Sequence, residues 1–141
     1  MFASKTAVIS GAQPPIFPAG AEVVVQRAQI TAVAADVAAN AVGAFLILPA
    51  GCVPVALYLD ADAALSADIG VLDSAETAVS TAAADGGAAW AAGLAANGAT
   101  QTCSKAMARV LPVQMDRKVG IKVTSAGSPG VVGLTLAYRA A

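Results

Sequence analysis

Hydrophobic and polar residues alternate along much of the chain with the two-residue period of a β-strand. The alternation is clearest over Val53–Leu59, Val119–Val123 and Val131–Tyr138. Glu22–Val33 is rich in β-branched residues, and Phe45–Leu48 is a continuous apolar run of the kind found in strands buried on both faces. The pattern predicts a strand in each of these five ranges.

Two further ranges, Ile69–Leu72 and Lys105–Val113, also have the composition of short strands. Residues 125–130 read Ser-Ala-Gly-Ser-Pro-Gly, which is the composition of a turn. We therefore predict that the last two strands of the chain form a hairpin.

Alanine dominates residues 82–97, and alanine has the highest helix propensity of all residues. Asp85 is a candidate N-cap, Asn97-Gly98 is a candidate helix end, and Trp90 and Leu94 are spaced to share one helical face. This range predicts one short helix across the end of the sheets.

The count of short strands separated by Gly, Pro and Asp turns predicts an all-β fold. The expected architecture is a jelly-roll-like antiparallel β-sandwich of about eight strands with one short helix and an extended N-terminal arm. The arm is residues 1–20, where three prolines exclude a helix or a central strand, and the sandwich domain is residues 21–141. In a monomer such an arm would be mobile, whereas on a neighbouring subunit its apolar anchors Phe2, Ile16 and Phe17 would be buried.

The composition favours a subunit of an assembly. Hydrophobic residues make up 57% of the 141 residues and charged residues only 12%, so weakly charged small residues must cover much of the surface. The longest apolar run, Ala41–Ala50, contains Pro49 and is too short to span a membrane. Thr6–Ala12 is too short and polar for the core of a signal peptide.

Charge is segregated along the chain. Six of the nine acidic residues lie between Asp60 and Asp85, and six of the eight basic residues lie between Lys105 and Arg139. These segments form either two solvated faces or two edges that pair between neighbouring subunits. The basic segment has no interleaved aromatic residues apart from Tyr138, which argues against nucleic acid as a partner.

No catalytic or metal motif is present. The chain has no histidine, which removes the commonest general base and every Ser-His-Asp or Cys-His arrangement. Cys52 and Cys103 form no metal motif, are too few for a disulfide scaffold, and are expected to be free thiols. A calcium loop starting at Asp60 fails at its fifth, sixth and twelfth positions. We therefore expect no enzyme activity, no cofactor and no metal.

One stretch of the chain resembles a known family. A Leu-Pro-Ala-Gly turn at 48–51 is followed by the alternating strand Val53–Leu59, the acidic Asp60-Ala-Asp62 and then Ala67–Asp73. This order is similar to that of small structural proteins of tailed phages, in particular the capsid cement or decoration proteins of short-tailed phages. The similarity covers about residues 32–74, with weaker agreement through Trp90 and the C-terminal strands.

The resemblance implies a virion structural protein that binds the outer surface of a phage capsid, as a homodimer, and cements neighbouring capsomers. Its partners would be the phage major capsid protein and itself, with no nucleic acid and no membrane, and assembly would occur in the host cytoplasm. On this reading we expect the arm residues Phe2, Ile16 and Phe17 to contact the capsid. Arg109, Arg117 and Lys118 would meet acidic capsid surface. The alternative is a phage head fibre or a receptor- or sugar-binding jelly-roll module, which would need exposed aromatic residues in a loop cluster.

Overall fold

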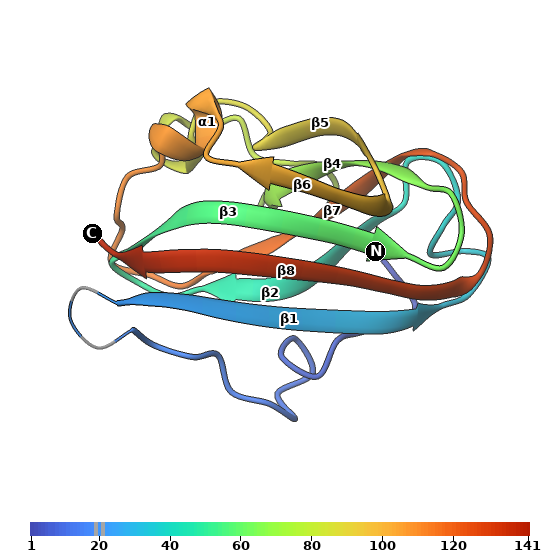
Figure 1. The fold of residues 1–141 in the computed structure, drawn as a ribbon, viewed down its shortest axis with the longest axis horizontal. Coiled ribbons are helices and arrows are strands. Elements are labelled where there is room, and N and C mark those ends of the chain that lie inside the picture. Colours follow the sequence, from blue (N-terminus) through green and yellow to red (C-terminus); the bar gives the residue numbers. More distant parts are fainter. Residues whose placement is uncertain (19, 21) are drawn as a thin grey trace.

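The computed structural model describes residues 1–18, 20 and 22–141, apart from the side chains of residues 97–99. Two four-stranded antiparallel sheets face each other across a shared apolar core (Figure 1). The strands of the first sheet are, in order, β1 (Val23–Ala32), β8 (Gly130–Ala140), β3 (Cys52–Ala61) and β6 (Asn97–Thr102). Those of the second sheet are β2 (Val42–Leu48), β7 (Arg117–Ser125), β4 (Ser66–Val71) and β5 (Ala91–Ala95).

Consecutive strands lie in opposite sheets at every step except β4 to β5, which pair directly. This order of eight antiparallel strands is that of a jelly roll. The predicted all-β sandwich is therefore confirmed. The predicted hairpin of the last two strands is wrong, because β7 pairs with β2 and β4 whereas β8 pairs with β1 and β3.

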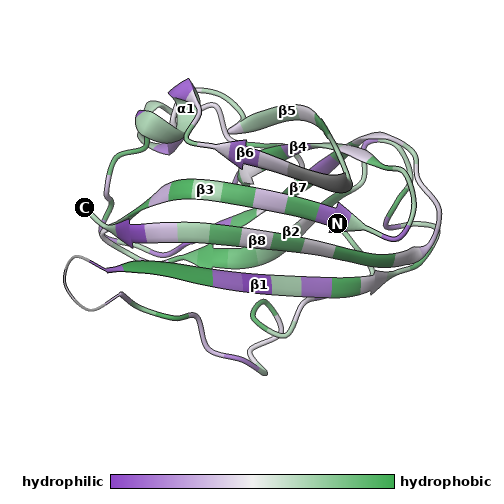
Figure 2. Ribbon diagram, in the orientation of Figure 1, coloured by the Kyte–Doolittle hydropathy of each residue, from purple (hydrophilic) through white to green (hydrophobic). Residues whose placement is uncertain are grey.

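The alternating ranges do form the strands. β1 pairs with β8 over ten consecutive residues without a register shift, and its even-numbered side chains point into the sandwich. β7 and β8 likewise bury alternate residues, among them Val119, Ile121, Leu134 and Leu136. Apolar colouring is concentrated on β2 and β3 and at the start of β1 (Figure 2). Period-two alternation thus identified the core face of β7 and β8 correctly, and that of β3 from Leu57 onward. The prediction that Val53 shares this face is wrong, because the register shift between Pro54 and Ala56 places Val53 opposite exposed Arg139.

The predicted helix at residues 82–97 is wrong. A single 3-10 turn, Ala83–Asp85, is followed by Gly86 and Gly87, both at positive φ, and the chain then enters β5. A side chain at Gly86 would overlap the carbonyl oxygen of Ala106. The turn therefore requires glycine, which ends the helix before it can elongate.

The predicted strand at Lys105–Val113 is also wrong. The range contains the structure's short helix, α1 (Lys105–Ala108), which Ser104 caps by accepting a hydrogen bond from the Met107 amide at 3.2 Å. After α1 the chain is irregular as far as Asp116. Ser104 is a strong N-cap residue, and this local hydrogen bond outweighs the apparent alternation.

Candidate interaction surfaces

The N-terminal segment folds back on the sandwich instead of projecting from it (Figure 1). Phe2 is buried in the core and packs edge-on against Phe45, with ring centroids 6.0 Å apart. A side chain at Gly43 would overlap the Phe2 ring. Thr6 is buried and donates to the Phe45 carbonyl oxygen at 2.6 Å. Phe2 thus belongs to its own chain's core, which corrects the prediction that it anchors on a neighbour.

Asp36 ties the start of this segment to the end of β1. Its buried carboxylate accepts hydrogen bonds from the amides of Ala3 at 2.7 Å, Ser4 at 3.4 Å and Val33 at 3.0 Å. Burial raises the pKa of Asp36, but the hydrogen bonds from Ser4, Val33 and Ala3 lower it more, so the pKa lies below its ordinary value. Asp36 is therefore charged at neutral pH and serves as an anchor.

Ile16 and Phe17, the other two predicted contacts of the arm, remain exposed. The backbone at Ile16 is held, because its carbonyl oxygen accepts the hydroxyl of buried Tyr138 and its amide contacts Gln26 Oε1 at 3.5 Å. Burial raises the pKa of Tyr138 to about 12, so the hydroxyl stays a donor. The two side chains are available to a partner. The predicted boundary after residue 20 falls at Ala21, outside the described residues.

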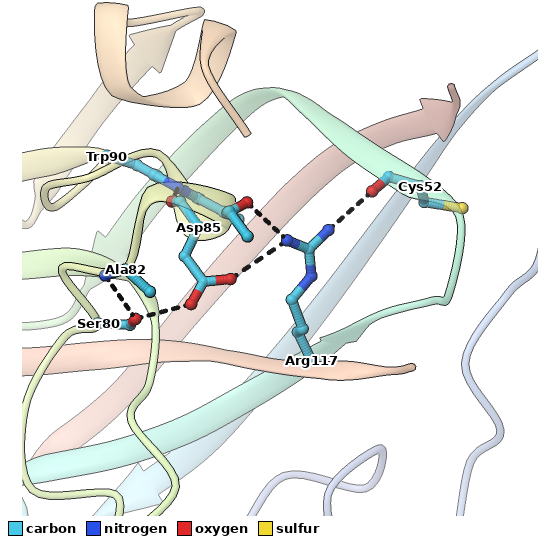
Figure 3. A network of polar contacts seen from close by, with 7 residues as sticks. Cys52, Ser80, Ala82, Asp85, Trp90 and Arg117 are labelled. Carbon is cyan, nitrogen blue, oxygen red and sulfur yellow. Dashed lines mark hydrogen bonds and ion pairs between the residues drawn. The ribbon is translucent and has the colours of Figure 1, made fainter. Parts of the chain in front are cut away.

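Arg117, predicted to face the capsid, is buried inside the chain (Figure 3). Nη1 contacts Asp85 Oδ1 at 3.2 Å and donates to the Ala84 carbonyl oxygen at 3.1 Å. Nη2 donates to the Cys52 carbonyl oxygen at 3.0 Å. Asp85 also accepts from Ser80 Oγ at 2.7 Å. Arg117 therefore joins β7, the start of β3 and the Ala83–Asp85 turn, and has no exposed charge to offer a partner.

Lys118 is exposed at its side chain but faces Glu76 Oε1 at 3.5 Å. With Arg117–Asp85, this is a second ion pair between the acidic and the basic segment of the sequence. The sequence led us to expect either two solvated charged faces or charge pairing between subunits. In the structure the acidic and basic segments instead partly neutralise each other within one chain.

A groove of about 490 Å³ lies beside these two ion pairs, between the end of β4 and the start of β7. Its apolar lining includes Val71, Leu72, Val113 and Met115. Its polar lining includes Asp73, Glu76 and Asp116 together with the two paired bases, Arg117 and Lys118. We call this feature the acidic groove, because its acidic lining residues outnumber its bases.

The irregular segment of residues 109–116 is hereafter the 109–116 loop, and its residues 113–116 form one wall of the acidic groove. Met115 is 68% exposed and Leu111 is 56% exposed. The Leu111 amide donates to the carbonyl oxygen of Ala84, another groove residue, at 2.9 Å. Arg109, the third predicted basic contact, is exposed on this loop. The loop therefore carries exposed Leu111 and Met115 and lines the acidic groove at its end, whereas Arg109, at its start, lines a separate hollow beside Trp90.

The outer face of the β1-β8-β3-β6 sheet is another surface with exposed apolar side chains. Val23, Val25 and Tyr58 are exposed on it. Arg27 on β1 reaches across β8 to Asp60 on β3, with Nη2 to Oδ1 at 2.6 Å and Nε to Oδ2 at 3.2 Å. The pair passes over Gly133, where a side chain would overlap the Arg27 guanidinium. The one acid and one base at the centre of this face therefore cancel each other.

The remaining predictions on chemistry concern the cysteines, metals and membranes. Both cysteines are free; Cys52 is buried, which raises the pKa of its thiol, and Cys103 is exposed. Within the described residues no three His, Cys, Asp or Glu side chains are grouped as a metal site would require. No helix in the same part of the chain is long and apolar enough to cross a membrane.

The sequence interpretation missed Asp36, Met115 and Glu76. Asp36 precedes a hydrophobic stretch in a turn, which signals only a local capping role, and its amide partners at residues 3 and 4 are distant in sequence. Met115 carries no signal of its own because its exposure depends on the loop that replaced the predicted strand.

No protein-family model matches the chain, and no curated protein matches it significantly. Among solved structures, a chain from the capsid of Ralstonia phage GP4 has a similar fold, with a TM-score of 0.69 and 24% sequence identity. The superposition covers 97% of this chain and 97% of that chain. The two proteins therefore share one fold from end to end.

Proposed function

We propose that this chain is a virion structural protein of a tailed phage. In this role it binds the outside of the capsid as a homodimer and cements neighbouring capsomers by non-covalent contacts. The observation that carries the proposal is the full-length likeness to a chain of a phage capsid, at 97% coverage of both chains. Residues 48–73 also resemble phage cement proteins, so both observations point to a structural protein of a phage.

The exposed surface suits a protein that works by contact area. Large apolar side chains are exposed on several parts of the chain, among them the N-terminal segment, the start of β1 and the 109–116 loop. These three parts include Ile16, Phe17, Val23, Val25, Leu111 and Met115. Specific protein interfaces bury about 1,200–2,000 Å² in total, and repetition over a closed shell multiplies modest affinities. We assign the capsid contact to the N-terminal segment.

The sugar-binding alternative is less well supported. Phe2, Phe45, Trp90 and Tyr138 are buried, which leaves two exposed aromatic residues on different elements: Phe17 before β1 and Tyr58 on β3. A sugar platform usually needs aromatic faces gathered at one site. A glycan-binding screen with the purified chain should accordingly give no specific ligand.

The experiment is binding to shells assembled from the major capsid protein of the same phage. The purified chain should co-sediment with these shells and raise their melting temperature, because it binds the assembled shell and not its free parts. Truncating residues 1–18 would open the core at Phe2 and Val8. The better variant is Ile16→Ser/Phe17→Ser, which changes only exposed side chains.

This double variant should keep the melting temperature of the free protein and bind shells at least about tenfold more weakly, a loss of about 1.4 kcal/mol. Val33→Ser, at another exposed apolar side chain, is the matched control and should bind like wild type. A wild-type protein that neither sediments with shells nor stabilises them would refute the proposed function. Equal binding of all three proteins would refute the assignment of the N-terminal segment.

A further inference from the structure

We propose that the dimer surface is the 109–116 loop together with the acidic groove, paired with the same surface of a second copy about a two-fold axis. The biological role of this dimer rests on the proposed function above. The surface itself follows from charges and exposed side chains of the described residues, and can be tested on the purified chain alone.

The acidic groove has uncompensated negative charge. Arg117 and Lys118 are matched by Asp85 and Glu76, at 3.2 and 3.5 Å. Asp73 and Asp116 are left with neutral donors: Asp73 accepts from Thr77 and Asp116 accepts from the Ala50 amide. Neither has a cationic partner within the described part of the chain. A partner that fits this groove would therefore present an apolar side chain and a base. The sequence, by contrast, led us to expect an acidic partner surface.

The chain presents such a complement at the start of the 109–116 loop, whose residues 113–116 line the groove. Arg109 is exposed and makes no ion pair with any described residue, and Leu111 follows it by two positions with more than half of its side chain exposed. In a two-fold interface a surface patch binds the same patch on the second copy, so one patch must carry both the groove and the side chains that fit it. The 109–116 loop and the acidic groove meet this requirement: the loop of each copy would bind the groove of the other.

Burial of exposed apolar area would supply most of the binding free energy. Leu111 and Met115 are among the most exposed large apolar side chains of the described residues. Methionine is flexible and polarisable, and is favoured at surfaces that adapt to a partner. The acids of the groove and Arg109 of the second copy would fix the orientation more than they add affinity.

The test compares two substitutions of matched chemistry. Met115→Lys places a charge in the proposed interface, and Val25→Lys places the same charge on β1, at positions that are 68% and 62% exposed. Both variants should fold with the wild-type melting temperature because both side chains point into solvent. Sedimentation velocity across a concentration series should show a dimer for wild type and Val25→Lys. The dimer dissociation constant of Met115→Lys should rise at least about tenfold, since the substitution occurs twice in each dimer.

Arg109→Glu supplies a second test that is independent of the apolar contact. It should weaken the dimer, and high salt should narrow the difference from wild type, because rim charges are screened. A wild-type chain that stays monomeric at roughly 100 µM would overturn the proposal, as would a dimer insensitive to both Met115→Lys and Arg109→Glu. A monomer that binds shells and loses binding on Met115→Lys would also overturn it, in favour of a capsid segment in the groove. The proposed binding to the capsid would survive that last outcome, but the proposal that the chain binds as a homodimer would not.

Discussion

Arg117 and Arg27 each join a carboxylate far away in the sequence, but they lie in opposite surroundings. The side chains of Arg117 and Asp85 are 6% and 15% exposed, whereas those of Arg27 and Asp60 are 41% and 27% exposed. Arg27 has the shorter contact, at 2.6 Å against 3.2 Å. A short distance is therefore no measure of what a pair contributes, because burial decides how much an unpaired charge would cost.

Arg117 also differs in what it holds. Its guanidinium binds carbonyl oxygens at Ala84 and Cys52 besides the Asp85 carboxylate (Figure 3). It thereby fixes the turn before β5 and the start of β3, both of which border surfaces described above. Arg27 by contrast bridges strands that the β-ladders already hold in register. Removing each arginine measures this difference directly.

Arg117→Ala should have the largest effect. It leaves the largely buried carboxylate of Asp85 without its cation, and it removes the donor from two carbonyl oxygens. The expected loss is about 3–5 kcal/mol in the free energy of unfolding, measured by chemical denaturation. Arg117→Lys keeps the charge but cannot reach all three acceptors in the same geometry, so it should lie between Ala and wild type. If Arg117→Ala lost less than about 1 kcal/mol, the role assigned to this network would be wrong.

Asp36→Asn tests a buried carboxylate that has amide partners and no cation. The side-chain oxygen of Asn cannot accept hydrogen bonds from all three backbone N–H groups, so the free energy of unfolding should fall by about 1–3 kcal/mol at pH 7. Because the folded pKa of Asp36 lies below its ordinary value, its stabilisation is present above that value and is lost as pH falls through the folded pKa. Melting curves between pH 7 and pH 2 should therefore show a smaller loss for Asp36→Asn than for wild type. Parallel curves for the two proteins would contradict this account.

Six of the eight strands could be predicted from the sequence because their signal is local, whereas β5 lies in the range predicted as a helix and no strand was predicted at β6. Alternation shows which side chains face the core, and β1, β7 and β8 follow it, as β3 does from Leu57 onward. Strand partners were not predictable in the same way: the turn at 125–130 suggested a hairpin, but the loop carries the chain from one sheet to the other. Alanine-rich residues 82–97 were misassigned because alanine is compatible with helix and strand, and Gly86, close against Ala106, decided the outcome through a tertiary contact.

The interaction surfaces were harder to predict than the fold. Whether a base is free depends on which acid folds next to it, and Asp85 precedes Arg117 by 32 residues. Composition alone made Arg117 and Phe2 appear as surface contacts. Ile16, Phe17 and Arg109 are exposed, as a contact with a partner requires. Their role in binding a partner stays a prediction.

Arg27→Ala is the exposed counterpart of Arg117→Ala and should have a far smaller effect. Exposed ion pairs contribute about 0–1 kcal/mol and weaken with salt. Chemical denaturation in low and high salt should show the difference between Arg27→Ala and wild type shrink as salt rises. An effect as large as that of Arg117→Ala would mean that burial does not govern the comparison.

Gly133→Ala should have the smallest effect and isolates the geometry of the exposed pair. The new methyl group would overlap the end of the Arg27 side chain, which is flexible and can swing into solvent. The substitution therefore breaks the Arg27–Asp60 contact while both charged side chains stay in place. The free energy of unfolding should change by no more than it does in Arg27→Ala, within about 1 kcal/mol. In the double variant the two effects should not add, because both remove one interaction. Full additivity would show instead that the alanine methyl group disturbs the β1-β8-β3 ladder itself, independently of the guanidinium above it.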